Sequence, residues 1–159
     1  MHRYTQFKTP FCEVILVGDE EGLSHLHLCT GEGKRIFNVS TEWIRDDAFF
    51  ENAREQVLEF MQGKRKIFDL VLNPSGTDFQ KTVWGELCRI PFGELRSYGE
   101  IAKAIGNKKA SRAVGLANSK NPIPLIIPCH RVVGANGSLT GFAHGLTIKE
   151  KLITLEKRE

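Results

Sequence analysis

The sequence predicts an α+β protein, with a small N-terminal antiparallel sheet followed by a mostly helical C-terminal domain that contains a helix-turn-helix. Apolar residues alternate with polar ones early in the chain and recur at helical spacing later, and turn formers at 73–76 separate these halves. The charge balance reverses at the same point. Residues 1–75 carry 9 Lys and Arg against 12 Asp and Glu, whereas residues 76–159 carry 13 against 7. We therefore expect domains at 1–75 and 76–159.

The composition excludes several classes of protein. With 41% hydrophobic and 26% charged residues, the 159-residue chain is an ordinary globular sequence and not a disordered, collagen-like or coiled-coil one. No apolar run approaches the roughly 20 residues of a membrane helix, and the first five residues lack the apolar stretch of a signal peptide. We expect a soluble, cytoplasmic protein with no membrane partner, whose basic second half meets a polyanion such as nucleic acid.

Strands and one helix are predicted in the first half. The strands are expected at 12–17, 23–28, 35–39 and 67–72. Alternating polarity at 23–28 after the turn cluster 18–22 indicates a hairpin with one buried face. Residues 47–62 change to helical spacing, with Asp47 as the expected N-cap and Gly63 as the expected stop.

The second half contains four predicted helices. The first begins at Thr77 or Asp78, and the second follows a capping box made by Ser97 and Glu100. A third, basic helix over 109–118 completes a helix-turn-helix pattern. Another capping box, Thr147 with Glu150, is expected to open the terminal helix.

The segment 121–128 contains three prolines and is expected to be extended and rigid, so that it delivers Cys129 to a fixed place. Cys129 lies in a Pro-Cys-His-Arg turn in which His130 and Arg131 supply positive potential, a setting that favours the thiolate. The other three cysteines, Cys12, Cys29 and Cys88, lie in strand or helix patterns and are expected to be inert. No C-x-x-C pair indicates a disulfide framework.

A base beside the cysteine needs an orienting carboxylate. His130 directly follows Cys129, and because neighbouring side chains point apart, a bridging water would be needed between them. Glu156 on the terminal helix is the preferred carboxylate, while Glu150 and Glu100 stay open at this point.

The motif at 127–133, together with Arg-Ala-Val-Gly at 112–115 and Asn-Pro-Ile-Pro at 121–124, resembles the active-site region of the O6-alkylguanine-DNA alkyltransferases, the methylated-DNA–protein-cysteine methyltransferases. The resemblance covers residues 77–157. Residues 1–75 are compatible with the family's variable N-terminal domain, a sheet of ribonuclease-H-like character.

The resemblance implies a reaction. Cys129 takes the alkyl group from O6 of guanine by in-line attack, His130 deprotonates it through a water, and Glu156 orients the histidine. The protein is not regenerated and needs no cofactor. The implied partner is double-stranded DNA carrying O6-alkylguanine, mainly O6-methylguanine, bound by a monomer; cooperative binding is left open.

The resemblance also implies how DNA is bound. The second helix of the helix-turn-helix enters the minor groove, where Ala110, Ala113 and Gly115 allow close approach. Arg112 is inserted in place of the flipped guanine, and Tyr98 presses on the adjacent phosphate.

The implied base pocket uses backbone groups as well as side chains. The carbonyls of Cys129 and Val132 accept from the guanine amine, and the segment 141–143 closes the pocket. Many relatives have tyrosine and serine where Phe142 and Ala143 stand, so O6 is served by the Ala143 amide. His144 stands where glycine is common and narrows the pocket, and Asn121 braces the turn before Cys129.

No metal is expected. Some members of the family bind a structural zinc in the N-terminal domain, but the corresponding positions hold Asp19 and Ser24. His25, His27 and Cys29 share one strand face but supply only three ligands, whereas structural zinc sites have four.

Three other functions compete. A lesion-binding module of the alkyltransferase-like type lacks the reactive cysteine that Cys129 supplies. A transcriptional regulator would use the helix-turn-helix, but no second DNA-binding module or dimerisation helix is evident. A cysteine hydrolase would use Cys129, His130 and Glu156 as a triad and would leave Arg112 without a purpose.

Overall fold

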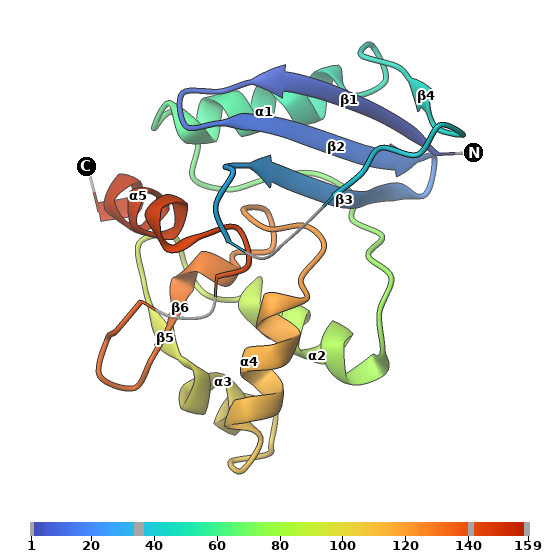
Figure 1. The fold of residues 1–159 in the computed structure, drawn as a ribbon. Coiled ribbons are helices and arrows are strands. Elements are labelled where there is room, and N and C mark those ends of the chain that lie inside the picture. The colour runs from blue at the N-terminus through green and yellow to red at the C-terminus, as the bar shows by residue number, and fades with distance from the viewer. Residues whose placement is uncertain (1, 34–36, 140–141, 158–159) are drawn as a thin grey trace.

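The N-terminal region, residues 1–75, is a four-stranded sheet with one helix against it (Figure 1). The computed structural model describes residues 2–33, 37–139 and 142–157. The elements of this region are β1 (Arg3–Lys8), β2 (Glu13–Asp19), β3 (Gly22–Cys29), β4 (Ile44–Arg45) and α1 (Glu51–Met61). The strands follow the order β3-β2-β1-β4, in which β1, β2 and β3 pair antiparallel and β4 pairs parallel with β1.

Apolar packing stabilises this region. Val14 and Leu16 of β2 join Val57 and Phe60 of α1 in one buried cluster. The helix ends as predicted, because Gly63 adopts a φ of +77° and the amides at 63 and 64 bond back to carbonyls of the last turn, as in a Schellman motif. The α+β class is confirmed.

Four local predictions for this region differ from the structure. Strand β1 was not predicted, because little of it besides Thr5 and Phe7 is buried. Helix α1 begins at Glu51 and not at Asp47, whose carboxylate instead accepts a hydrogen bond from the Thr5 hydroxyl at 2.6 Å. The segment 67–72 is irregular apart from one bridge to β3. In the expected strand 35–39, residues 35 and 36 lie outside the described residues and 37–39 form no strand.

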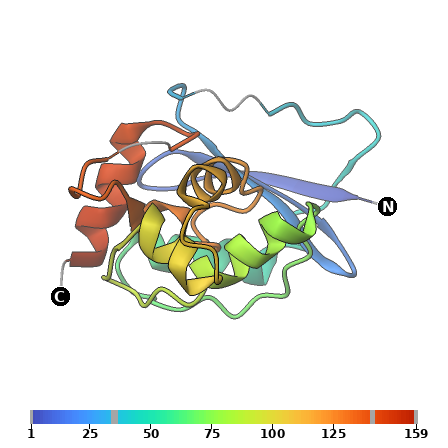
Figure 2. The same cartoon turned by 90° about the horizontal axis from the view of Figure 1, so that it is seen from below.

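The C-terminal region, residues 76–159, is mostly helical (Figure 2). Its elements are α2 (Asp78–Leu87), β5 (Arg96–Ser97), α3 (Tyr98–Ala104), α4 (Ser111–Ser119), the 3-10 turn η1 (Cys129–Arg131), β6 (Val132–Val133) and α5 (Leu146–Lys157). Capping boxes open α2 at Thr77 and α3 at Ser97. Helices α3 and α4 pack on each other as the predicted helix-turn-helix.

Two predictions for the C-terminal region are wrong. The proline-rich segment 121–128 is a compact turn and not an extended segment, because the Ile127 amide bonds back to the Ile123 carbonyl and Leu125 adopts a φ of +76°. Helix α5 begins at Leu146, so Thr147 lies within its first turn and its hydroxyl donates to Glu32 instead of capping the helix. In the part of the chain that the structure describes, no helix is long and apolar enough to span a membrane.

Candidate active site

A short parallel sheet and a buried asparagine pair hold Cys129 in place. Strand β5 pairs with β6, so the turn η1 that carries Cys129 lies beside the start of the helix-turn-helix. Asn121 Nδ2 donates to the Ile127 carbonyl at 2.8 Å, as the bracing role requires, and Asn118 Nδ2 reaches the Cys129 carbonyl at 3.4 Å. Cys129 itself is only 3% exposed. The asparagines therefore order the backbone on which the thiol sits.

His130 is fully buried, and its Nε2 lies 2.6 Å from Glu156 Oε2. Of the three carboxylates that were left open, the structure brings Glu156 to this histidine; Glu100 is used in the capping box of α3 and Glu150 is exposed. Burial lowers the pKa of His130, although the bond to Glu156 raises it in part. A neutral imidazole that donates from Nε2 keeps a lone pair on Nδ1, which has no hydrogen-bond partner among the described residues.

The Arg131 guanidinium pairs with the Glu156 carboxylate. Its Nε and Nη2 donate to the Glu156 carboxylate at 2.8 and 2.9 Å, and its Nη1 donates to the Ile90 carbonyl at 2.7 Å. The direct hydrogen-bond partners of the Arg131 guanidinium are thus the Glu156 carboxylate and the Ile90 carbonyl. Burial alone raises the pKa of Glu156, but the hydrogen bonds from His130 and Arg131 outweigh it and lower the pKa to about 2. The carboxylate is consequently ionised near neutral pH.

Lys149 is a member of the site that the sequence reasoning missed. It lies on α5, is 0% exposed, and donates from Nζ to the Val132 carbonyl at 2.6 Å. Desolvation lowers its pKa to about 8, while the nearby Cys129 raises it. The signal in the sequence was weak, because Lys149 directly follows the apolar Ile148 and a lysine at the edge of an apolar helix face normally extends its ammonium group into solvent.

The segment around Phe142 forms the wall beside this lysine. Phe142 is buried, the Lys149 ammonium lies 5.9 Å from its ring centroid, and Ala143 is half-buried. Gly141 lies outside the described residues. The Val132 carbonyl, expected to accept from guanine, already accepts from Lys149, which leaves one lone pair for a ligand.

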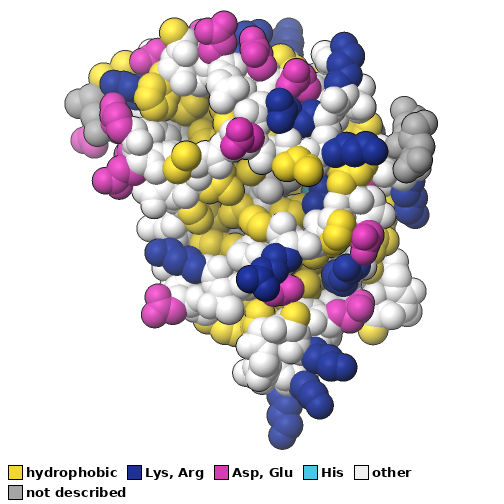
Figure 3. Space-filling view, turned by 180° about the vertical axis from the view of Figure 1, so that it is seen from behind, with side chains coloured by type: hydrophobic (Ala, Val, Ile, Leu, Met, Phe, Trp, Pro, Cys, Tyr) yellow, Lys and Arg dark blue, Asp and Glu magenta, His cyan; other side chains and the backbone are white. Residues whose placement is uncertain are grey.

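The helix-turn-helix exposes a basic tip. Figure 3 shows Lys and Arg side chains gathered at the end of the molecule formed by the turn between α3 and α4. Arg112 and Ala113 are exposed on α4, and the Tyr98 ring packs near Gly115. Ala110 is only 8% exposed, so its methyl group faces the core and leaves only its backbone for contact with a ligand.

The remaining cysteines and histidines differ from Cys129 in their surroundings. Desolvation raises the pKa of Cys12 to about 11 and also raises those of Cys29 and Cys88, as inert thiols require. The rings of His25 and His27 pack against Phe37. Within the described ranges, no group of three or more His, Cys, Asp or Glu residues is arranged to hold a metal ion.

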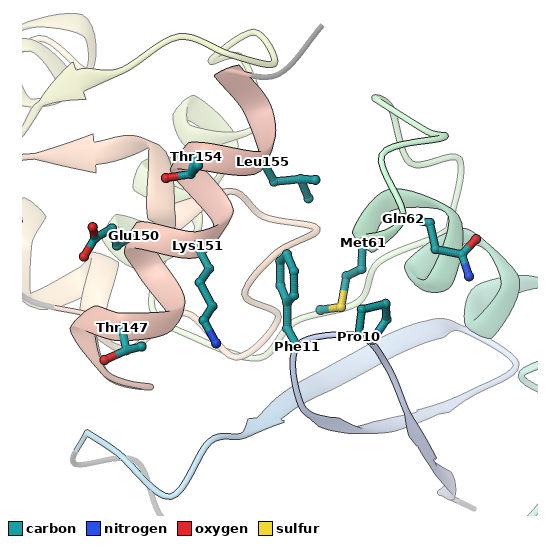
Figure 4. Close-up of a pocket in the computed structure, with 9 residues that line it drawn as sticks. All are labelled: Pro10, Phe11, Met61, Gln62, Thr147, Glu150, Lys151, Thr154 and Leu155. Atoms are coloured by element: carbon teal, nitrogen blue, oxygen red, sulfur yellow. The ribbon is translucent and has the colours of Figure 1, made fainter.

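A separate groove of about 780 Å³ lies between α5 and the N-terminal region (Figure 4). Phe11 and Met61 face Leu155 and Lys151 of α5 across it. The opposite face of α5 supplies Lys149 and Glu156 to the buried network, so the helix separates the groove from His130 and Val132.

Comparison with known proteins decides the family. The model of the 6-O-methylguanine DNA methyltransferase DNA-binding domain matches residues 78–158, and that of the family's ribonuclease-like domain matches residues 2–74. The chain belongs to the 6-O-methylguanine DNA methyltransferase family. The resemblance seen in the sequence motifs is thereby confirmed.

Relatives in this family are similar over nearly their whole length. The methylated-DNA–protein-cysteine methyltransferase of Methanosarcina acetivorans is 53% identical over 96% of this chain and 97% of that protein. That of Mycobacterium tuberculosis is 44% identical over 99% of this chain and 93% of that protein. The chain is accordingly a methylated-DNA–protein-cysteine methyltransferase that acts in DNA repair by alkyl transfer.

Solved structures of the family have the same fold as this chain. The crystal structure of Mycobacterium tuberculosis O6-methylguanine methyltransferase superposes with a TM-score of 0.89 at 43% identity, covering 99% of this chain and 93% of that one. The same Mycobacterium protein in complex with DNA superposes equally well over 98% and 92%. DNA is therefore the partner of this methyltransferase.

Proposed function

We propose that this methyltransferase flips O6-alkylguanine, mainly O6-methylguanine, out of duplex DNA and transfers the alkyl group irreversibly to Cys129 Sγ, once per molecule. The observation that carries the proposal is the 2.6 Å contact between His130 Nε2 and Glu156. An ionised carboxylate can only accept a hydrogen bond, so His130 Nε2 must carry the proton in this contact. The lone pair on His130 Nδ1 is then available to accept the proton of the adjacent Cys129.

The proposed reaction removes a proton from Cys129 and then adds the alkyl group to its sulfur. His130 Nδ1 accepts the Cys129 proton through a water, and the imidazolium formed is stabilised by Glu156. The Sγ lone pair attacks the alkyl carbon in line with the C–O6 bond, which breaks and leaves its electrons on guanine. The guanine anion that is released takes up one proton from water, which restores the normal base. Arg131 holds Glu156 in the orientation that this relay needs.

The product explains single use. An S-alkylcysteine is a thioether, and it has no good leaving group through which water could return the thiol. No group among the proposed site residues could reverse the step. Each molecule therefore repairs one base, and no cofactor takes part.

The helix-turn-helix is the proposed DNA-binding element. Helix α4 would enter the minor groove with Ala113 and Gly115 against the sugar-phosphate backbone, and Arg112 would replace the flipped guanine in the stack. Tyr98, which lies at the first position of α3 and packs near Gly115, would press on the adjacent phosphate. Ala110 would contribute through its backbone because its side chain is buried.

The base pocket is proposed between the Cys129 turn and the Phe142 segment. The Val132 and Cys129 carbonyls would accept from the guanine amine, and the Ala143 amide would donate to O6. Lys149 would add positive charge beside the thiolate and hold the Val132 carbonyl. Asn121 would keep the turn rigid. In this division of labour, residues 76–159 bind DNA and react, and residues 1–75 form a supporting domain.

The decisive experiment is intact-mass measurement with peptide mapping after incubation with excess duplex that contains one O6-methylguanine. We expect one methyl group on Cys129, guanine restored in the DNA and no second turnover. Binding to the lesion without a mass change would instead indicate a lesion-sensing module. Repeated turnover on small esters would indicate a hydrolase.

A further inference from the structure

Residues 30–33, which follow β3, contact the segment 142–147 that forms the proposed pocket wall and opens α5. The Thr30 hydroxyl donates to the His144 carbonyl at 2.6 Å. In the opposite direction, the Thr147 hydroxyl donates to Glu32 Oε1 at 3.1 Å. These two bonds join parts of the chain that are more than 110 residues apart in sequence.

The two backbones approach so closely that glycine is required on both sides. A Cβ atom at Gly33 would lie 2.2 Å from the Ala143 carbonyl oxygen, and one at Gly145 would lie 2.6 Å from the Glu32 Cβ. Both glycines also have positive φ values, +77° and +106°, which side chains other than glycine rarely adopt. The contact therefore depends on two glycines that allow the backbones to approach, as well as on the two hydrogen bonds.

Aromatic rings extend the contact to the pocket wall. The His27 ring on β3 lies 5.1 Å from the His144 ring, which lies 5.8 Å from the Phe142 ring. Phe142 has the Lys149 ammonium near it as well. The N-terminal sheet thus supports the wall of the proposed pocket from behind, although it contributes none of the proposed reactive groups.

We propose that residues 30–33 are a positioning element for alkyl transfer and that the Thr30 hydroxyl sets the width of the base pocket. The inference rests on the proposed function. His144 is only 2% exposed, so loss of the Thr30 hydroxyl removes a 2.6 Å hydrogen bond to the carbonyl of a buried residue. The segment 142–145 then relaxes away from Cys129, which weakens the alignment of a small alkyl group and admits a larger one.

The test compares Thr30→Val, which keeps the side-chain shape, with Thr30→Ser, which keeps the hydroxyl. Thr9→Val is the matched control. Besides its bond to the His144 carbonyl, the Thr30 hydroxyl accepts from the Glu32 amide at 3.2 Å. The Thr9 hydroxyl makes the same two kinds of bond, donating to a backbone carbonyl at 2.6 Å and accepting from the amide two residues later at 3.2 Å, but it lies in the turn between β1 and β2. Each variant is assayed for the rate of transfer from duplexes that carry O6-methylguanine or O6-benzylguanine, and for amide hydrogen exchange over 142–147.

We expect Thr30→Val to lower the methyl-transfer rate by about fivefold, which corresponds to one lost hydrogen bond. The ratio of benzyl to methyl rates should rise, and exchange over 142–147 should accelerate. Thr30→Ser should restore all three quantities, and Thr9→Val should change none of them. A general loss of stability would lower both transfer rates together and leave their ratio unchanged.

The outcomes separate the two proposals. If the parent protein alkylates itself but Thr30→Val matches Thr9→Val in rate ratio and in exchange, the positioning role is wrong and the proposed function stands. If the parent protein acquires no alkyl group on Cys129, the proposed function fails, and the positioning role fails with it.

Discussion

The two regions of this methyltransferase bury different kinds of side chain. Among the described residues, the N-terminal region buries only two polar side chains, Thr5 and Gln56. The C-terminal region buries seven: Asn118, Asn121, His130, Arg131, His144, Lys149 and Glu156. Because buried charges cost free energy even when they are paired, the second region carries groups that a purely structural core would replace with apolar ones. The comparison teaches that apolar packing dominates the core of the first region, whereas the second region adds a buried polar network at the proposed active site.

The largest expected effect is that of Cys129→Ala. Transfer from O6-methylguanine duplex should be abolished, while affinity for the damaged duplex and the unfolding midpoint stay close to those of the parent protein. Intact mass, a DNA-binding titration and thermal unfolding would measure the three quantities. Alkylation at another cysteine in this variant would show that reactivity does not depend on Cys129 alone.

Glu156→Gln should damage both chemistry and stability. Removing the charge leaves Arg131 buried without its partner, which should lower the free energy of unfolding by about 3–5 kcal/mol. Loss of the relay should slow transfer by about 100-fold or more.

Leu16→Ala in the N-terminal core is the matched variant for Glu156→Gln. It should lower the free energy of unfolding by a similar amount, about 2–5 kcal/mol, yet leave transfer per folded molecule unchanged. Denaturant unfolding and single-turnover kinetics on the folded fraction would compare the two. If Leu16→Ala slows transfer as strongly as Glu156→Gln, the N-terminal core affects the reaction as much as the buried polar network does, and the proposed difference between the two regions is wrong.

Arg112→Ala should separate DNA handling from the reaction itself. Unstacking a base costs a few kcal/mol, so loss of the inserted side chain should slow transfer from duplex by roughly 30-fold. Transfer from free O6-benzylguanine base, which needs no flipping, should change little. Measured on both substrates, equal losses would rule out the inserted role of Arg112.

The pH dependence should reflect the buried histidine and glutamate. Burial lowers the pKa of His130 below its usual 6.5, so the base stays neutral at pH 7 and transfer should fall by about tenfold per unit once the pH drops below that lowered value. The pKa of Glu156 is about 2 in the folded protein against 4.5 ordinarily, so the stability that this group contributes is present above pH 4.5 and is lost as the pH falls toward 2. Glu156→Gln should remove the second dependence, as urea unfolding at a series of pH values would show.

The smallest expected effect is that of Cys12→Ala. Because desolvation raises the pKa of this thiol to about 11, almost none of it is thiolate at neutral pH. The transfer rate of Cys12→Ala should match that of the parent protein. In the parent protein, iodoacetamide should modify Cys12 far more slowly than it modifies a small-molecule thiol. Rapid labelling of Cys12, followed by peptide mapping, would contradict the inert assignment.

Local patterns were enough to predict many of the elements. The helix start at Thr77, the capping box at Ser97, the glycine stop at Gly63 and the β2–β3 hairpin depend on residues a few positions apart, so each can be found in one short stretch of sequence. Elements with little buried surface were missed, as β1 shows. The proline-rich turn before Cys129 was predicted wrongly because prolines exclude a helix without specifying what replaces it.

The sequence by itself determined the class of the fold and the family, and it indicated Cys129 as the candidate nucleophile, because periodicity, caps and a short motif depend on neighbouring residues. The resemblance also implied Glu156 as the carboxylate at His130, whereas the other residues alone left Glu150 and Glu100 open. Only the tertiary structure brought Glu156 to His130, placed Arg131 against the same carboxylate, and buried Lys149 near Cys129. These contacts join residues 17 to 26 positions apart. The packing of α5 against η1 determines which charged side chains of the helix reach His130, and no pattern of neighbouring residues predicts that packing.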